Sequence, residues 1–173
     1  MKVLALGGSG GMGRYAVQSL YQHPKIKKIY VADINADAAK DFSLSFSDKV
    51  EGIGLDVTKH ESLLEVMSKV DIVVNTTGPF FKFAELILRA SIEANCHYFD
   101  ICDDWEPTEK MFLLDNQAKN AGITAILGLG ASPGLTNILA YMAMLELDDI
   151  SKVYTGWDMS SAKPEPISSQ KGV

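Results

Sequence analysis

Short apolar runs alternate with amphipathic segments along most of the chain. The runs predict six strands, at residues 3–6, 29–32, 50–55, 71–75, 97–101 and 123–127. Apolar residues at helical spacing predict helices at residues 14–22, 36–46, 59–69, 83–94 and 109–120. Asn35 is placed to cap the second helix and Gly122 to end the last one. The alternation predicts an α/β fold with a doubly wound parallel sheet, in the strand order 3-2-1-4-5-6.

The pattern changes after residue 127. A glycine-rich turn at 128–134 is followed by a predicted apolar helix at 135–147 and a predicted strand at 152–157. Residues 160–173 are polar and contain Pro164 and Pro166, so they offer no core of their own. We therefore expect one domain over residues 1–130, and only the start of a second, truncated α+β domain over residues 131–173.

The first predicted strand runs directly into a glycine-rich turn. Gly8, Gly10 and Gly13 form a G-x-G-x-x-G, and Asp33 follows the next strand, 20 residues after Gly13. In such a βαβ unit the first glycine permits the turn, the second lets a pyrophosphate approach, and the third lets the helix pack on the strand. The unit predicts a Rossmann-type site for a nicotinamide dinucleotide. The alternative is a glycine loop that only connects a strand to a helix.

Ligands of doubly wound sheets bind beyond the carboxyl ends of the strands. The predicted cofactor-binding residues are Gly8, Ser9, Gly10, Gly11, Met12, Gly13, Asp33, Ile34, Asp56, Val57, Thr76, Thr77, Gly78 and Pro79. Asp56 and Val57 could meet the adenine, or Asp56 could cap the next helix, and both can hold. The segment 76–79 could border the nicotinamide ribose or be a plain turn. Asp33 favours NAD, since a carboxylate there repels a 2′-phosphate, with NADP as the alternative.

An acidic cluster follows the fifth predicted strand, beside the expected nicotinamide end. It contains Asp100, Asp103, Asp104 and Glu106. Such a cluster could hold the cationic amino group of a substrate or transfer a proton. The alternative is a solvated loop in which Asp104 or Thr108 caps a helix. Asp100 and Asp103 are therefore the candidate catalytic residues.

Composition excludes several classes of partner. The net charge of −6 argues against non-specific binding to nucleic acid, which requires a basic surface. No apolar run approaches the roughly 20 residues of a membrane span. The chain enters a strand within three residues, so no signal peptide is expected, and Cys96 and Cys102 give no disulfide framework. We expect a cytoplasmic protein. Cys96, His97, Cys102 and Asp103 lack a C-x-x-C pair, so no metal site is expected.

Five segments together resemble a known family. They are the turn at 8–13, LDVT at 55–58, NTTGPF at 75–80, HYFD at 97–100 and GASPGLTN at 130–137. In this order they resemble the saccharopine dehydrogenase (reductase)-like family, which includes the lysine dehydrogenases. The resemblance covers essentially the whole chain, and its most specific part is the last segment, because a generic dinucleotide fold does not require it.

The resemblance implies an activity. Family members are amino-acid oxidoreductases that use a nicotinamide cofactor to make or oxidise a C–N bond, and a substrate domain follows their Rossmann domain. The chain would then be the cofactor-binding portion of an NAD(P)-dependent oxidoreductase acting on a CH–NH group of a small amino-acid-type substrate, and inactive alone. The substrate-side candidates are Ser132, Pro133, Gly134 and Asn137.

Two further expectations follow. The apolar helix after Gly134 would be left exposed, which favours a homo-oligomer. The alternative function is a non-catalytic dinucleotide-binding or redox-sensing module, since fold does not fix function. A metal-dependent hydrolase is set aside because the chain lacks suitable ligand spacing.

Overall fold

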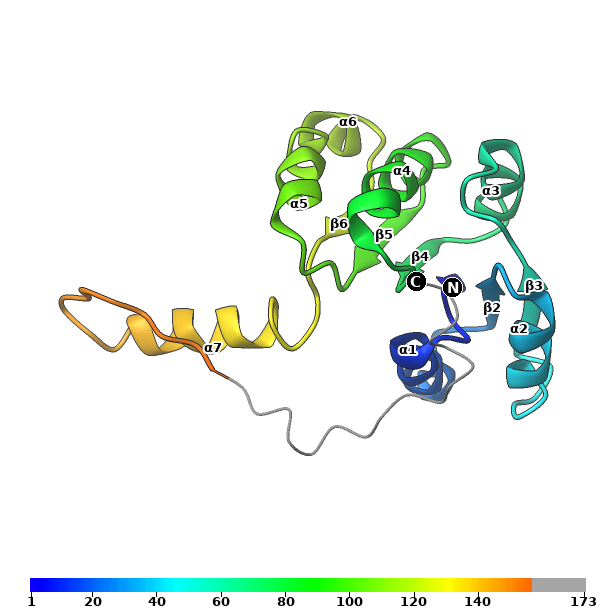
Figure 1. Cartoon of the computed structure of the whole chain (residues 1–173), viewed down its shortest axis with the longest axis horizontal. Helices are drawn as coiled ribbons and strands as arrows, with labels where there is room; N and C mark the ends of the chain where they lie inside the picture. The colour runs from blue at the N-terminus through cyan, green and yellow to red at the C-terminus, as the bar shows by residue number, and fades with distance from the viewer. Residues whose placement is uncertain (157–173) are drawn as a thin grey trace.

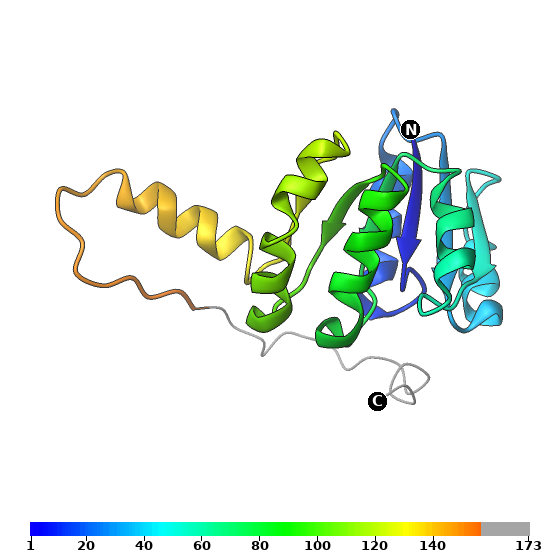
Figure 2. The same cartoon turned by 90° about the horizontal axis from the view of Figure 1, so that it is seen from above.

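A computed structural model describes residues 1–156 and shows a single parallel sheet with helices on both faces (Figures 1 and 2). The strand order is β3-β2-β1-β4-β5-β6, and every neighbouring pair is parallel, as predicted. The strands are β1 Lys2–Leu6, β2 Lys28–Asp33, β3 Val50–Gly54, β4 Ile72–Asn75, β5 His97–Asp100 and β6 Ala125–Ile126. The helices are α1 Gly11–Gln22, α2 Ala36–Ser43, α3 His60–Met67, α4 Phe80–Glu93, α5 Trp105–Phe112, α6 Asp115–Asn120 and α7 Leu135–Met144.

Strand β1 divides the core into two layers. Val3 and Ala5 pack with residues of α1 and α2 on one face, whereas Leu4 and Leu6 pack with residues of α3, α4 and α5 on the other. All four side chains are buried. This is why β1 reads as a continuous apolar run rather than an alternating one. Burying each larger side chain contributes about 1.5–3 kcal/mol, and the central strand fixes where the following glycine turn must lie.

Several predicted helix boundaries differ from the structure by about three residues, and the helix predicted at 109–120 differs most. The predicted helix at 109–120 is two helices, α5 and α6, separated at Leu113 and Leu114. At this break Leu114 packs in the core and is 2% exposed, whereas Leu113 is 81% exposed. Helix α4 begins at Phe80, three residues before the predicted start. Gly122 ends α6 as predicted, with φ of 69° and a hydrogen bond from its N–H to the Lys119 carbonyl.

Helix α7 projects away from the sheet (Figure 1). None of its residues is buried, and its exposed apolar side chains include Ile138, Leu139, Tyr141 and Met142. The strand predicted at 152–157 is not formed over residues 152–156, and no neighbouring strand pairs with them. Residue 157 and the polar segment 160–173 lie outside the described residues.

Candidate dinucleotide-binding site

The glycine turn after β1 is tightly constrained. Gly7 has φ of +66°, the left-handed region that favours glycine, and its carbonyl accepts the Gly10 N–H at 3.0 Å. A Cβ on Gly7 would lie 2.9 Å from the Thr76 carbonyl oxygen. Gly7 is therefore the residue whose backbone requires a positive φ. The sequence motif instead predicts that Gly8 is the glycine that permits the turn. At Gly8 the constraint is packing, because a Cβ would lie 2.8 Å from the Ala5 carbonyl.

Gly10 and Gly13 differ sharply in their surroundings. A Cβ on Gly13 would lie 2.1 Å from the Gly7 oxygen and 2.7 Å from Gly8 Cα, so α1 packs directly against the turn. A Cβ on Gly10 would meet only the Gly7 oxygen, at 3.2 Å. No side chain caps the amino end of α1. An open glycine beside uncapped helix N–H groups is suited to a phosphate.

The carboxyl end of β2 meets this turn through Asp33. The Ser9 hydroxyl donates to Asp33 Oδ2 at 2.5 Å, and the Asn35 N–H donates to Oδ1 at 3.1 Å. Ser9 is buried, Asp33 is half-buried and Ile34 is 78% exposed. The structure thus brings together the glycine turn predicted to bind the phosphates, the Asp33 carboxylate predicted to bind the ribose, and the exposed Ile34 side chain, which is free to contact a base.

Arg14 also joins this cluster, although sequence reasoning did not select it. Its Nε donates to the Ser9 carbonyl at 2.6 Å, and its guanidinium carbon lies 4.8 Å from the centre of the Phe42 ring. The signal was a cation directly after the last glycine of the motif. Only the structure shows that this side chain lies toward the turn.

Asp56 and Val57 are only partly suited to an adenine contact. Asp56 Oδ1 accepts hydrogen bonds from the Thr58 N–H at 2.9 Å and the Thr58 hydroxyl at 2.7 Å. These bonds lower the pKa of Asp56. Asp56 therefore closes a turn before α3 without capping the helix itself, whose N-cap is Lys59. Val57 is 9% exposed and belongs to the core, so its side chain does not support the predicted contact with the adenine ring.

The loop after β4 contains an unpaired hydroxyl. Asn75 Oδ1 accepts the Thr77 N–H at 2.9 Å, and the Thr76 hydroxyl donates to the Leu6 carbonyl at 2.8 Å. The Thr77 hydroxyl is buried without a hydrogen-bond partner among the described residues. Beside it, a Cβ on Gly78 would have no atom within 4 Å. A buried hydroxyl next to open space fits a ligand oxygen, so the residues here suit a dinucleotide.

Asp100 does not lie free in a pocket. It is 1% exposed and accepts hydrogen bonds from the Tyr98 hydroxyl at 2.9 Å, the Cys102 N–H at 3.1 Å and the Gly128 N–H at 2.7 Å. Burial raises its pKa, and the hydrogen bonds oppose that rise. The Asn75 amide in turn donates to the Tyr98 hydroxyl at 3.0 Å. The predicted catalytic role of Asp100 is therefore not supported, because its carboxylate is enclosed by the protein.

The rest of the acidic cluster is dispersed. Asp104 accepts the Phe81 N–H at 3.0 Å, so it caps α4 rather than its own helix α5. Glu106 pairs with Lys110 at 2.9 Å on the surface. Asp103 is exposed. The structure does not gather these carboxylates into one site.

The turn after β6 is closed by glycines and Asn137. Gly134 has φ of +118°, and a Cβ there would lie 2.2 Å from the Gly130 oxygen. The Asn137 side chain accepts the Gly134 N–H at 3.1 Å and so helps to begin α7. Ser132 and Pro133 are half-buried within this turn. The predicted substrate-side residues thus shape the start of α7.

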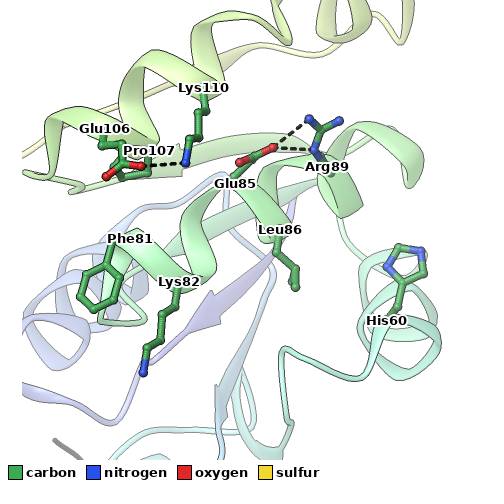
Figure 3. A pocket seen from close by; sticks show the side chains of 9 residues that line it. All are labelled: His60, Phe81, Lys82, Glu85, Leu86, Arg89, Glu106, Pro107 and Lys110. Atoms are coloured by element: carbon green, nitrogen blue, oxygen red, sulfur yellow. Dashed lines mark hydrogen bonds and ion pairs between the residues drawn. The ribbon is translucent and has the colours of Figure 1, made fainter.

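A groove of about 370 Å³ lies elsewhere, on the outer surface of α4 between α3 and α5 (Figure 3). Its lining residues are His60, Phe81, Lys82, Glu85, Leu86, Arg89, Glu106, Pro107 and Lys110. Arg89 pairs with Glu85 at 2.8 Å, and Lys110 pairs with Glu106. None of the predicted cofactor residues lines this groove, and its charges largely satisfy one another.

The fold and the glycine-turn cluster define a dinucleotide-binding α/β domain. Residues 3–126 match the family model described as the saccharopine dehydrogenase NADP binding domain. The chain therefore belongs to this family, as the sequence segments predicted, and its cofactor is a nicotinamide dinucleotide.

Curated relatives are much longer than the chain. It is 32% identical over 124 residues to an alpha-aminoadipic semialdehyde synthase of Arabidopsis thaliana, a match that covers 72% of the chain and 11% of the relative. It is 29% identical over 120 residues to a carboxynorspermidine synthase of Vibrio cholerae, a match that covers 62% and 28%. The chain thus spans only a small part of each relative.

A solved structure shows the same fold. Apo saccharopine dehydrogenase (L-Glu forming) of Saccharomyces cerevisiae aligns with a TM-score of 0.73 at 23% identity, over 84% of the chain and 31% of that protein. Within residues 1–156 no helix is both long and apolar enough to span a bilayer. The same residues hold no group of three or more His, Cys, Asp or Glu side chains arranged for a metal ion.

Proposed function

We propose that the chain is the cofactor-binding portion of an NAD(P)-dependent oxidoreductase that acts on a CH–NH group of a small amino-acid-type substrate. The observation that carries the cofactor site is the cluster of open Gly10, Asp33 and the unpaired Thr77 hydroxyl at the carboxyl edge of the sheet. The names of the relatives, which include a saccharopine dehydrogenase and a carboxynorspermidine synthase, support an amine-bearing substrate.

Each residue of the site has a proposed task. The N–H groups at the start of α1 bind the pyrophosphate, with Gly10 leaving room for it. Asp33 accepts the adenosine ribose hydroxyls, and Ile34 contacts the adenine. The Thr77 hydroxyl gains a partner from the ribose on the nicotinamide side. When bound, the nicotinamide ring accepts or donates a hydride, while the protein sets its distance and orientation to the substrate.

Asp33 also bears on the choice of cofactor. Its half-buried carboxylate lies where the 2′-oxygen of the adenosine ribose is expected. A second negative charge at that oxygen is repelled by the carboxylate. We therefore propose that NAD binds more tightly than NADP.

The remaining expectations about the whole protein are part of the same proposal. Residues from 131 onward would belong to a second, substrate-binding domain, with Ser132, Pro133, Gly134 and Asn137 at its border. The exposed apolar residues of α7 favour assembly of copies as a homo-oligomer. Two free, buried cysteines fit a cytoplasmic location.

A non-catalytic dinucleotide-binding module is the second candidate. It is favoured by the enclosure of Asp100, which removes the better-placed of the two candidate catalytic carboxylates. The two functions differ in turnover. The full-length oxidoreductase produces NADH when screened with amino acids, whereas a binding module does not.

The first test is a calorimetric titration of NADH into the chain and its Gly10→Val variant. The branched side chain would occupy the space of the pyrophosphate, so affinity should fall more than tenfold, which is about 1.4 kcal/mol. Circular dichroism checks that the variant is folded. A folded variant that binds NADH as tightly as the parent places the site elsewhere.

A further inference from the structure

The side chain of Arg14 is held in one direction by two contacts. Its Nε donates to the Ser9 carbonyl at 2.6 Å, and its guanidinium stacks over the Phe42 ring at 4.8 Å. The first contact comes from the glycine turn and the second from α2, which follows β2. The guanidinium therefore lies between the glycine turn and the last turn of α2, on the side of the sheet where α1 and α2 pack.

Ser9 connects Arg14 to Asp33. The Ser9 hydroxyl donates to Asp33 at 2.5 Å, while its carbonyl accepts from Arg14. Asp33 is the proposed partner of the adenosine ribose. Arg14 and Asp33 thus both contact Ser9, Arg14 through the Ser9 carbonyl and Asp33 through the Ser9 hydroxyl.

The terminal guanidinium nitrogens retain their hydrogen-bonding capacity. Arg14 is exposed, and none of the ion pairs among residues 1–156 involves it. Its contact with Ser9 uses Nε, so the two outer nitrogens can still donate together. A planar pair of donors matches the oxygens of a phosphate monoester better than an ammonium does.

We propose that Arg14 forms the subsite for a phosphate monoester on the adenosine 2′-oxygen, the group that distinguishes NADP from NAD. The proposal rests on the proposed function, because it places the adenosine at Asp33. Asp33 can keep its bond to Ser9 while Arg14 binds the phosphate, so the site accepts both cofactors. Asp33 favours NAD, and Arg14 limits the penalty for NADP.

The test compares two ligands that differ only in the 2′-phosphate, adenosine 5′-monophosphate and adenosine 2′,5′-diphosphate. Their dissociation constants are measured by calorimetry for the parent, Arg14→Met and Arg14→Lys. Methionine keeps an aliphatic stem against Phe42 without the charge, and lysine keeps the charge without the planar fork. The readout is the ratio of the two constants, which cancels any shared effect on the glycine turn.

Arg14→Met should weaken binding of the diphosphate at least tenfold relative to binding of the monophosphate. For Arg14→Lys, the ratio of the two dissociation constants should lie between those of the parent and Arg14→Met. The diphosphate affinity of the parent should also decline more steeply with salt than that of Arg14→Met. An unchanged ratio in Arg14→Met overturns the subsite, even if the parent binds both ligands. Failure of the parent to bind adenosine 5′-monophosphate or NADH at all would instead overturn the proposed function.

Discussion

Gly13→Ala tests whether the packing of α1 on the glycine turn holds the fold together. The added Cβ would lie 2.1 Å from the Gly7 oxygen, whereas ordinary contacts begin at 3.4 Å. The Gly7 oxygen cannot move away freely, because it accepts the Gly10 N–H at 3.0 Å and the Thr76 hydroxyl at 3.2 Å. The helix or the turn must therefore shift by about 1.3 Å.

The expected loss of stability follows from these contacts. Overpacking of this severity reaches about 3 kcal/mol, and weakening two hydrogen bonds adds about 1 kcal/mol each. Alanine has a higher helix propensity than glycine, and this stabilises the variant by about 1 kcal/mol. We expect the free energy of unfolding of Gly13→Ala to fall by about 4 kcal/mol.

Urea unfolding followed by circular dichroism measures this loss, with Gly10→Val as the matched control. Gly10 has φ of −74° and ψ of 175°, which valine adopts readily, and its Cβ would meet one atom, the Gly7 oxygen at 3.2 Å, so that a shift of a few tenths of an ångström relieves the contact. The control should stay within about 1 kcal/mol of the parent while losing affinity for NADH. If Gly13→Ala is also within 1 kcal/mol of the parent, the close packing of α1 does not constrain the fold as argued.

Two further predictions concern the cofactor and the substrate. The parent should bind NADH more tightly than NADPH, and Asp33→Ser should narrow or reverse that gap in calorimetric titrations; tighter binding of NADPH by the parent would contradict the role of Asp33. The 173-residue chain alone should turn over no amino acid, because an open cofactor face cannot hold a substrate at near-attack distance and exclude water. Steady NADH formation from NAD with lysine, saccharopine or another amino acid would show that its pocket is complete.

The sheet could be predicted from the sequence because its central strand, β1, is buried on both faces and the neighbouring strands β2 and β4 are largely apolar. Runs such as Val3 to Leu6 and Ile72 to Val74 are apolar throughout, and the lengths of the connections leave room for a helix after each strand. The break between α5 and α6 could not be predicted, because Leu113 and Leu114 continue the apolar spacing of one helix. Which leucine is buried depends on the groove between neighbouring helices rather than on local sequence.

The candidate site was predicted in part. The spacing from Gly13 to Asp33 predicts that the two residues belong to one site, since the rest of α1 and then β2 fit between them. Sequence alone could not distinguish Gly7 from Gly8 as the left-handed residue. It also could not show that the Thr77 hydroxyl lacks a partner.

Asp100 shows a different limit. An acid at the end of a strand is expected to face the ligand, but Asp100 lies two residues from Tyr98 and so shares its buried face. The sequence of β5 does not show which of its two faces is buried. Tyr98 and Phe99 point to opposite faces, and both are aromatic. The direction of the carboxylate was set by the Gly128 N–H, 28 residues away.

Asp100→Asn is the last prediction, and its effect should depend on pH. An asparagine must keep its oxygen toward the Gly128 and Cys102 N–H groups, so its amide would face the Tyr98 hydroxyl. That hydroxyl already accepts from Asn75, so its own proton would lose its acceptor. A buried donor without a partner costs about 1–3 kcal/mol. The variant should therefore be less stable than the parent at pH 7 by about this amount.

The pH dependence of this difference in stability shows whether burial or hydrogen bonding has the larger effect on the pKa of Asp100. Burial raises the folded-state pKa of Asp100 above its ordinary value of 3.8, so the folded state binds this proton more tightly than the unfolded state. The resulting stabilisation is full below about pH 3.8 and is lost as pH rises through the folded-state pKa. Asparagine does not titrate. The difference in unfolding free energy between parent and Asp100→Asn should therefore grow in favour of the parent as pH falls from 7 toward 4. If the difference shrinks instead, the three donated hydrogen bonds outweigh burial, and the pKa of Asp100 is lowered in the folded protein.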